Sequence, residues 1–388
     1  MTIPYARQAI NDADIEAVVA VLRSDFLTQG PAVPAFENAV AQCVGARYGV
    51  AVNSATSALH IACLALGVGQ GDRVWTTAIT FVASANCALY CGATVDFVDI
   101  DPRTYNLSVE RLAEKLAGAQ KAGTLPKVVI PVHLCGQPCD MAGIHALSQQ
   151  YGFRIIEDAS HAIGSQYQGQ PIGRGQFSDI TVFSFHPVKI ITTGEGGMAV
   201  TQDTALAARL RLLRSHGISN NPANMVPRPA HEIWNYQQID LGFNYRMTDL
   251  QAALGLSQMQ RLDAFVAQRH TLAKRYDQLL AGLPVLTPWQ HPDSYSAYHL
   301  YVIRLRLGAG RKTQRQVYQA LHAAGILVNL HYIPVYLQPY YEKRGFSAGY
   351  CPQAEQYFTE AISIPLYPGL TTAQQDQVVA AMKEAVSV

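Results

Sequence analysis

The chain reads FSDITVFSFHPVKIITTGEGG from Phe177 to Gly197, and this stretch decides the fold. Residues 180–185 are apolar and β-branched enough to form a core strand. Pro187 cannot continue a hydrogen-bonded ladder, and the glycine-rich run at 192–197 favours a tight turn before a second strand. We therefore expect a strand, a sharp turn and a glycine hairpin, with one lysine, Lys189, held in the turn.

Lys189 has only apolar neighbours, Val188, Ile190 and Ile191. Burial disfavours the charged form of a lysine and leaves a nucleophilic amine that can form a Schiff base. The alternative is that Lys189 packs only its stem and keeps its ammonium group in water, as lysines commonly do. The stretch alone does not separate these two interpretations.

The composition describes a globular protein. The chain has 388 residues, 49% of them hydrophobic and 15% charged, which is enough for a large domain and a smaller one and excludes extended disorder. A net charge of +1 without basic runs argues against nucleic acid as a partner. The first residues lack a signal-peptide pattern, and no segment holds the roughly 18 uninterrupted apolar residues of a membrane span. We expect a soluble, cytoplasmic protein.

The seven cysteines are odd in number and lie in apolar contexts, which favours reduced, buried thiols over disulfides. His133, Cys135 and Cys139 lie close enough in sequence to suggest zinc ligands. Their spacing and the lack of a matching fourth ligand nearby favour a loop with packed cysteines. We expect no metal.

From Gly49 the chain alternates apolar strands with helices, which predicts an α/β fold with a mostly parallel seven-stranded sheet. The expected strands are 49–53, 73–77, 94–98, 127–132, 154–157, 180–185 and 197–201. Helices are expected between them, at 57–65, 81–90, 109–115 and 142–150.

After residue 202 the chain changes character. A helix is expected at 205–215, followed by a polar excursion at 220–238 to which we assign no role. Thr248 then caps a long helix that leads to a smaller α+β domain. We expect a large domain with an N-terminal arm at 1–248 and a small domain at 249–388.

Three strand ends carry residues suited to a cofactor, because ligands of parallel sheets bind beyond the carboxyl ends of the strands. Residues 53–57 open a helix whose free amides suit a phosphate. Ordinary capping by Ser54 or Thr56 explains the same residues and is favoured when the motif is taken alone. Asp158 could keep a ring nitrogen protonated or cap the next helix. Phe81 could stack on a planar cofactor or pack in the core.

Together with Lys189, these residues describe a pyridoxal phosphate site better than a nucleotide site. The chain has no Walker-type motif, and its glycine run at 194–197 leads into a strand where a dinucleotide fold needs a helix.

Several long stretches go further than these patterns. They are SDFLTQGP at 24–31, FVASANCALYCGA at 81–93, GQPCDM at 136–141 and HYIPVYLQPYY at 331–341. Through them the chain closely resembles the DegT/DnrJ/StrS family of pyridoxal phosphate-dependent sugar aminotransferases, from Ile3 to Leu370. The resemblance implies a fold-type-I aminotransferase, and within the family it is closest to the branch that acts in pseudaminic acid synthesis.

The resemblance also implies roles for individual residues. Lys189 would hold the cofactor as a Schiff base and shuttle a proton, and Asp158 would pair with the pyridinium nitrogen. The remaining cofactor contacts would come from Ala55, Thr56 and Ser184 at the phosphate, Phe81 on the ring face, His161 near the phenolic oxygen, and Asn244 from a neighbouring subunit.

Four further residues are implied on the substrate side. Arg246 would also reach into the neighbouring subunit's site, so the active unit would be a homodimer with shared sites. Tyr5, His331 and Tyr332 would approach the sugar nucleotide, although the tyrosines could equally pack at the domain seam. Two departures from the family pattern bear on substrate preference: Tyr336 stands where a histidine is expected, and Ile190 where a small polar residue is usual.

The implied reaction transfers the amine of L-glutamate to C4 of a UDP-linked 4-keto-6-deoxy-N-acetylhexosamine. The same chemistry on a bacillosamine-type or perosamine-type precursor is an alternative. The family's sugar dehydratases carry histidine at the lysine position, so Lys189 argues against them. A non-catalytic regulatory role would be favoured only if Lys189 or Asp158 had been lost.

Overall fold

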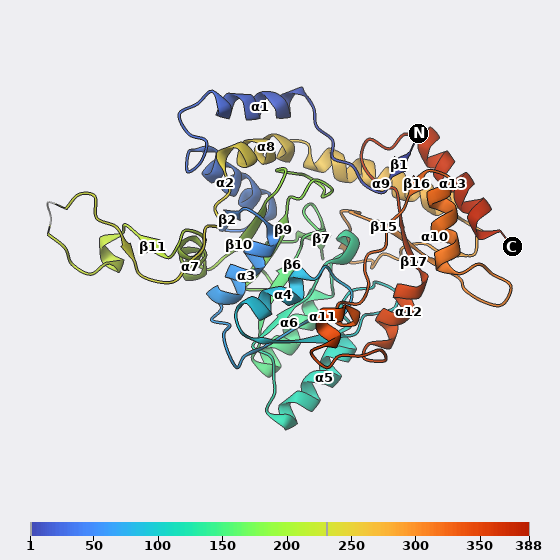
Figure 1. The fold of residues 1–388 in the computed structure, drawn as a ribbon, viewed down its shortest axis with the longest axis horizontal. Coiled ribbons are helices and arrows are strands. Elements are labelled where there is room, and N and C mark those ends of the chain that lie inside the picture. The colour runs from blue at the N-terminus through green and yellow to red at the C-terminus, as the bar shows by residue number, and fades with distance from the viewer. Residues whose placement is uncertain (1, 230–231, 388) are drawn as a thin grey trace.

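A seven-stranded sheet organises the computed structural model, which describes residues 2–229 and 232–387 (Figure 1). In spatial order the strands are β2 (Tyr48–Val52), β10 (Gly197–Thr201), β9 (Ile180–Ser184), β6 (Arg154–Asp158), β5 (Val128–Ile130), β3 (Arg73–Thr77) and β4 (Thr94–Val98). Neighbouring strands run parallel except for β10, which is antiparallel to both β2 and β9. The predicted α/β class, with a mostly parallel seven-stranded sheet, is confirmed.

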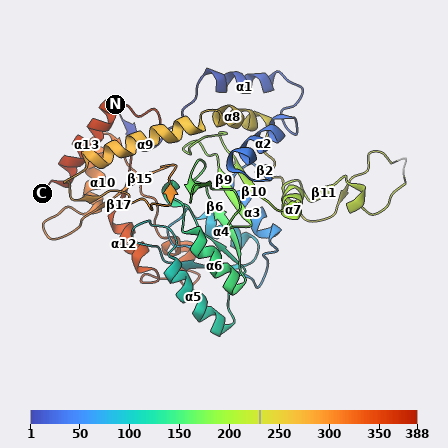
Figure 2. The ribbon, with the colours of Figure 1, turned by 180° about the vertical axis from the view of Figure 1, so that it is seen from behind.

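Helices cover both faces of this sheet, as the two opposite views show (Figures 1 and 2). One face packs against α3 (Ala55–Ala65), α4 (Ala83–Tyr90) and α7 (Thr204–Arg214). The other face packs against α2 (Ala32–Val44), α5 (Val109–Ala122), α6 (Met141–Tyr151) and α8 (Asp249–Met259).

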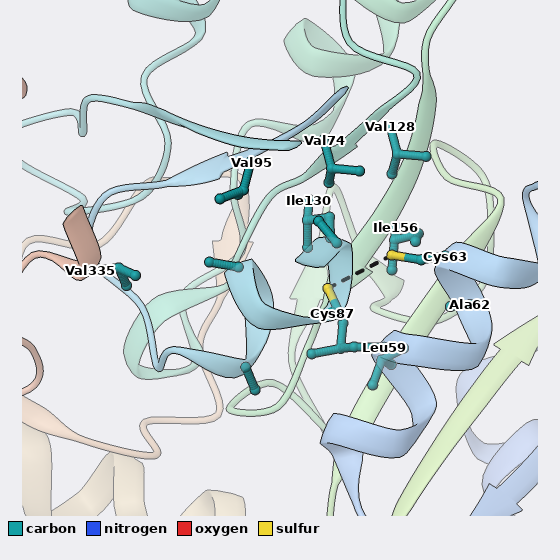
Figure 3. Close-up of a cluster of buried hydrophobic side chains, with 14 of the residues drawn as sticks. Leu59, Ala62, Cys63, Val74, Cys87, Val95, Val128, Ile130, Ile156 and Val335 are labelled. Carbon is teal, nitrogen blue, oxygen red and sulfur yellow. Dashed lines mark hydrogen bonds between the residues drawn. The ribbon is translucent and has the colours of Figure 1, made fainter. Parts of the chain in front are cut away.

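Figure 3 shows the core between the sheet and the helices α3 and α4. Cys63 of α3 and Cys87 of α4 lie 3.7 Å apart between their sulfurs and contact strand residues such as Ile156. Successive strand residues point to opposite faces, so Ile155 belongs to the core on the other side. Asp158 therefore lies on the α3 and α4 side of β6, and Glu157 on the opposite side.

The C-terminal part has its own core around a three-stranded antiparallel sheet. Its strands are β13 (Val285–Leu286), β15 (Tyr301–Leu305) and β17 (Ala361–Ile364), and its helices are α9 (Leu262–Leu279), α10 (Gln314–Ala323) and α13 (Thr372–Val386). The N-terminal arm joins this part, because β1 (Ile3–Pro4) pairs in parallel with β16 (Ile326–Leu327). The domain division at 248 remains a proposal.

Shorter elements complete the described chain. They are α1 (Asp12–Leu22), α11 (Pro339–Glu342), α12 (Pro352–Glu360), β7 (Gln166–Tyr167), β8 (Gln170–Pro171), β11 (Ile218–Ser219), β12 (Gln237–Gln238) and β14 (Ser294–Tyr295), with 3-10 turns at Leu134–Gly136, Pro222–Asn224 and Val335–Leu337. The excursion at 220–238 forms part of an arm that projects beyond α7 in Figure 1, and residues 230–231 of it lie outside the described residues.

The single long helix expected after Thr248 is wrong. The chain forms α8 and α9 with a break at Gln260 and Arg261, where Arg261 leaves the helical conformation. The Arg261 guanidinium donates to the carboxylate of Asp14 in α1, a contact made 247 residues away in sequence. This long-range contact lies at the break between the two helices.

No helix of the described residues is long and apolar enough to span a bilayer. Within the same ranges, no group of three or more histidine, cysteine or acidic side chains is arranged to hold a metal ion. Both nitrogens of His133 already have protein partners, since Nδ1 accepts from the Cys139 amide and Nε2 contacts Glu157.

Candidate active site

A pocket of about 850 Å³ opens beyond the carboxyl ends of the central strands. It is within the size range of small-molecule and cofactor sites. Ten of the residues singled out in the sequence line it: Tyr5, Ala55, Thr56, Phe81, Asp158, His161, Ser184, Lys189, His331 and Tyr332. Asn244 and Arg246 do not line it.

Lys189 lies in the turn between β9 and β10, where its amide donates to the His186 carbonyl over 2.9 Å. Ile190 and Ile191 beside it are buried. Burial lowers the pKa of the Lys189 amine to about 8, and the nearby carboxylate of Asp158 opposes this shift. The structure thus favours the nucleophilic amine over a lysine whose head group stays in water.

Asp158 ends β6 at the pocket and is only 4% exposed. Its Oδ1 accepts from the amide and hydroxyl of Ser160 at 3.1 and 2.5 Å, and its Oδ2 accepts from the Ser84 hydroxyl at 2.6 Å. A carboxylate offers about four lone-pair positions, so three donors leave one on Oδ2 for a ligand. No helix directly follows Asp158, so the alternative role as a helix cap does not apply.

The N-terminus of α3 supplies backbone donors at the same pocket. Ser54 caps this helix by accepting from the Ser57 amide at 3.1 Å, which leaves the amides of Ala55 and Thr56 without an acceptor among the described residues. A Cβ at Gly197 would lie 2.4 Å from the Ala55 nitrogen, so this glycine permits the close approach of β10 and α3. Capping and free amides therefore coexist, and the free amides fit a phosphate group.

The position of one hydrogen on His161 follows from its contacts. Its Nδ1 accepts from the Cys135 amide at 3.3 Å, and its Nε2 lies 3.3 Å from the Tyr332 hydroxyl oxygen. Burial, reinforced by Lys189 and His331, holds the pKa of His161 well below its ordinary value, so the ring is neutral. Nε2–H consequently donates to Tyr332, and the Tyr332 hydroxyl proton is left for the pocket.

Aromatic side chains from both parts of the molecule frame the opening. Phe81 is 56% exposed and its ring centroid lies 6.2 Å from that of Tyr332, so the ring is available to stack on a planar ligand and is not core packing. Tyr5 of the N-terminal arm lies 5.2 Å from His331, measured between ring centroids. His331 Nδ1 lies 2.8 Å from the Ser363 hydroxyl of β17. The pocket is thus walled by the large sheet and by the C-terminal part.

Arg246 lies beside the end of β2 and Asn244 beside Ser215, which follows α7, and neither residue lines this pocket. Arg246 forms a bridge with Val52, and the Asn53 amide donates to the Tyr245 carbonyl at 2.8 Å. Their expected reach into a second subunit's site remains a proposal.

The two departures from the family pattern also lie away from the pocket lining. Tyr336 is buried in the core, where its hydroxyl donates to Glu355 at 2.6 Å. Ile190 is buried in the core on the other side of the sheet.

Sequence reasoning missed several lining or supporting residues: Ser84, Ser160, His299 and Asn329. His299 packs against His161 with tilted rings, whose centroids lie 4.4 Å apart. Ser84 lies three residues after Phe81, and a serine in the first turn of a helix is too common to stand out as a functional signal.

Comparisons with known proteins agree with this site. A family model for the DegT/DnrJ/EryC1/StrS aminotransferase family matches residues 8–383. The spore coat polysaccharide biosynthesis protein SpsC of Bacillus subtilis is 38% identical over 99% of this chain and 97% of its own.

Two solved structures superimpose over nearly the whole chain. Helicobacter pylori PseC, an aminotransferase involved in pseudaminic acid biosynthesis, has a TM-score of 0.89 and 28% identity, covering 100% of this chain and 99% of its own. Spr1654 of Streptococcus pneumoniae in its PLP-form has a TM-score of 0.87 and 29% identity, with 100% of both chains covered.

Proposed function

The chain belongs to the DegT/DnrJ/EryC1/StrS aminotransferase family, and from this premise we propose that it moves the amino group of L-glutamate to C4 of UDP-2-acetamido-2,6-dideoxy-β-L-arabino-hexos-4-ulose. The product would be UDP-4-amino-4,6-dideoxy-N-acetyl-β-L-altrosamine, an intermediate for pseudaminic acid. That the protein is a pyridoxal phosphate-dependent sugar aminotransferase follows from the family and its solved relatives. The likeness to PseC supports this particular acceptor.

One observation carries the proposal: the amine of a half-buried lysine and a buried carboxylate share one pocket. Lys189 and Asp158 both line it, and the Asp158 carboxylate opposes the burial that lowers the pKa of Lys189 to about 8. Transamination needs both groups, one to exchange a proton with the substrate carbon and one to maintain the cofactor's positive charge.

Pyridoxal phosphate supplies the electron sink that stabilises a carbanion and also carries the amine between the two substrates. Lys189 is the base and acid in our proposal, because an amine with a pKa near 8 releases and accepts protons at neutral pH. Asp158 would use its fourth lone-pair position to accept a hydrogen bond from the protonated ring nitrogen, which would keep the positive charge on the ring.

The remaining contacts divide between the phosphate and the ring. The amides of Ala55 and Thr56, with Ser184 at the end of β9, would bind the phosphate. Phe81 would cover one face of the ring. The Tyr332 hydroxyl, which accepts from His161, would donate its proton to the phenolic oxygen or to the substrate.

The acceptor sugar would enter from the side that Tyr5, His331 and Tyr332 form. We also propose a homodimer in which Asn244 and Arg246 of one subunit reach the site of the other. Large apolar side chains left exposed on the single chain support an association, among them Ile15 and Leu22 of α1 and Trp234 of the arm, which is 72% exposed.

The direct test is an assay of the pyridoxal phosphate-loaded protein with L-glutamate and, separately, the L-arabino and D-xylo UDP-4-keto-6-deoxy-N-acetyl sugars. The product is identified by NMR. Amination of the L-arabino sugar alone is the expected result.

A second candidate is the same reaction on another nucleotide-linked 4-keto-6-deoxy sugar, of the bacillosamine or perosamine type. The 38% identity to SpsC, a protein of spore coat polysaccharide biosynthesis, favours keeping it. Preference for the D-xylo sugar would preserve the mechanism and overturn the proposed acceptor. Release of 2-oxoglutarate without either product would leave a sugar aminotransferase with a different acceptor.

A further inference from the structure

Three hydroxyl or amide donors hold the Asp158 carboxylate, and one of them comes from outside its own loop. Ser160 is two residues away in sequence, so its contacts form within a local turn. Ser84 is 74 residues away, on α4, and is fully buried. Its hydroxyl is therefore placed by the packing of α4 against the sheet and not by the turn that follows Asp158.

The direction of the hydrogen bonds around Ser84 can be deduced from proton counts. A hydroxyl has a single proton, and an ionised carboxylate has none, so the Ser84 proton lies on the 2.6 Å contact to Asp158 Oδ2. The 2.7 Å contact between Ser84 and the Thr80 hydroxyl must then be donated by Thr80. The result is a buried chain from Thr80 to Ser84 to Asp158, in which each bond polarises the next.

The location of Ser84 adds to this effect. It occupies the first turn of α4, whose N-terminal end favours a nearby negative charge. The same segment carries Phe81 at the mouth of the pocket, so one rigid element presents both the ring-covering side chain and the donor to Asp158.

We propose that Ser84, supported by Thr80, is a positioning residue for the reaction: it fixes the orientation and the ionised state of Asp158 so that the free position on Oδ2 meets the ring nitrogen of the cofactor. This inference rests on the proposed function for its catalytic meaning. Its test uses cofactor binding alone, so it does not depend on which sugar the enzyme accepts.

The experiment compares Ser84→Ala with Ser148→Ala. Ser148 is a matched control, because its buried hydroxyl also lies on a helix but donates to the His145 carbonyl at 2.8 Å, far from Asp158 in the hydrogen-bond network. Two quantities are measured: the affinity of the apoprotein for pyridoxal phosphate, and the pH midpoint of the visible absorbance of the loaded protein.

Ser84→Ala should weaken cofactor binding roughly tenfold, as expected for one lost hydrogen bond to a charged group. It should also move the absorbance midpoint to higher pH. Without the Ser84 donor the Asp158 carboxylate is a stronger base and draws the proton of the ring nitrogen toward itself. This leaves less positive charge on the ring to oppose protonation of the Lys189 nitrogen. Ser148→Ala should change neither quantity.

Wild-type affinity and an unchanged midpoint in Ser84→Ala would overturn the proposal. If Ser84→Ala does not fold, Thr80→Val decides, because it keeps the bond from Ser84 to Asp158 and removes only its polarising donor. A smaller shift of the midpoint in the same direction supports the chain of hydroxyls, and no shift refutes it. If the cofactor affinity and the absorbance midpoint change as expected but the protein aminates neither sugar, the result would count against the proposed function only.

Discussion

Glu157 and Asp158 are adjacent carboxylates on one strand, yet they serve opposite sides of the sheet. Glu157 accepts from His133 Nε2 at 2.8 Å, from the Thr181 hydroxyl at 3.1 Å and from the Ser178 hydroxyl. Asp158 likewise accepts three hydrogen bonds, from Ser84 and Ser160. The two groups are almost equally buried, at 4% exposure each.

The difference lies in what remains beyond the three donors. Burial raises the pKa of the Glu157 carboxyl, but the bond and charge of His133 and the two hydroxyls outweigh it, so the pKa falls below its ordinary value. The donors that stabilise the Glu157 carboxylate all come from within the protein. Asp158 instead borders the pocket and the amine of Lys189. On one face of the sheet, the buried and hydrogen-bonded Glu157 contributes to stability. On the other face, the equally buried Asp158 borders the pocket and prepares a site for a ligand.

The largest expected effect comes from removing the amine that Asp158 faces. Lys189→Ala should reduce turnover by about 10³-fold or more, because both the Schiff-base nucleophile and the proton carrier are lost. The melting temperature should change little, since no buried partner is left uncompensated. Lys127→Ala, which removes a surface lysine paired with Asp72 at 2.9 Å, is the control and should retain activity. Near-normal turnover in Lys189→Ala would refute the mechanism.

Asp158→Asn should lower kcat by about 10²- to 10³-fold, the usual cost of losing one preorganised electrostatic contact in an active site. The amide keeps the size of the side chain but cannot hold a ring proton by charge. Steady-state kinetics and thermal melting of the same preparation check this. If Asp158→Asn instead lost as much stability as a core mutation and kept its kcat, Asp158 would have the same structural role as Glu157, and the proposed difference between the two faces of the sheet would be wrong.

The pH dependence of cofactor uptake should report Lys189 directly. Only the neutral amine attacks the aldehyde, so the uptake rate of the apoprotein should rise with pH and level off above about 8. At pH 7 the neutral fraction of such an amine is about 10²-fold larger than that of a lysine with an ordinary pKa near 10.4, so cofactor uptake should be faster by the same factor. Stopped-flow absorbance from pH 6 to 10 measures it.

The same pH series on Asp158→Asn tests whether the Asp158 carboxylate acts on the Lys189 amine. Loss of the carboxylate charge removes the effect that raises the pKa of Lys189, so the midpoint should move further down. A wild-type rate that keeps rising beyond pH 10 would show that the amine is solvated.

The smallest effect is expected on the core face. Glu157→Gln should destabilise the protein by about 1–3 kcal/mol at pH 7, because a charged acceptor of buried donors is replaced by a neutral one. kcat should stay near the wild-type value. Urea unfolding checks the first statement, and Glu114→Gln, which alters an exposed ion pair with Arg111, is the control.

The way in which the destabilisation by Glu157→Gln depends on pH follows from the lowered pKa of Glu157. A carboxyl whose pKa is lower in the folded state stabilises the protein above the ordinary pKa near 4.3, and the contribution disappears as pH falls through the folded value. The difference between wild type and Glu157→Gln should therefore shrink below about pH 4. A deficit that persists there would point to lost packing instead.

Local patterns in the sequence predicted the large sheet well. Short apolar β-branched runs such as Ile180–Ser184, bounded by Pro187 and the following glycines, identify strands whatever lies around them. The helix expected after Thr248 breaks at Arg261, whose side chain contacts Asp14. Periodicity within one segment carries no information about such a distant partner.

The sequence by itself determined the order of strands and helices, and with it the sheet edge at which Lys189 and Asp158 would meet, because strand ends follow from local patterns. Alternation along β6 also determined that Glu157 and Asp158 would point to opposite faces. Only the tertiary structure decided which face holds the pocket, that Ser84 donates to Asp158, and that Tyr5 and His331 close the far wall. These features depend on contacts between segments far apart in the chain, which the packing of α4, the N-terminal arm and the C-terminal part brings together.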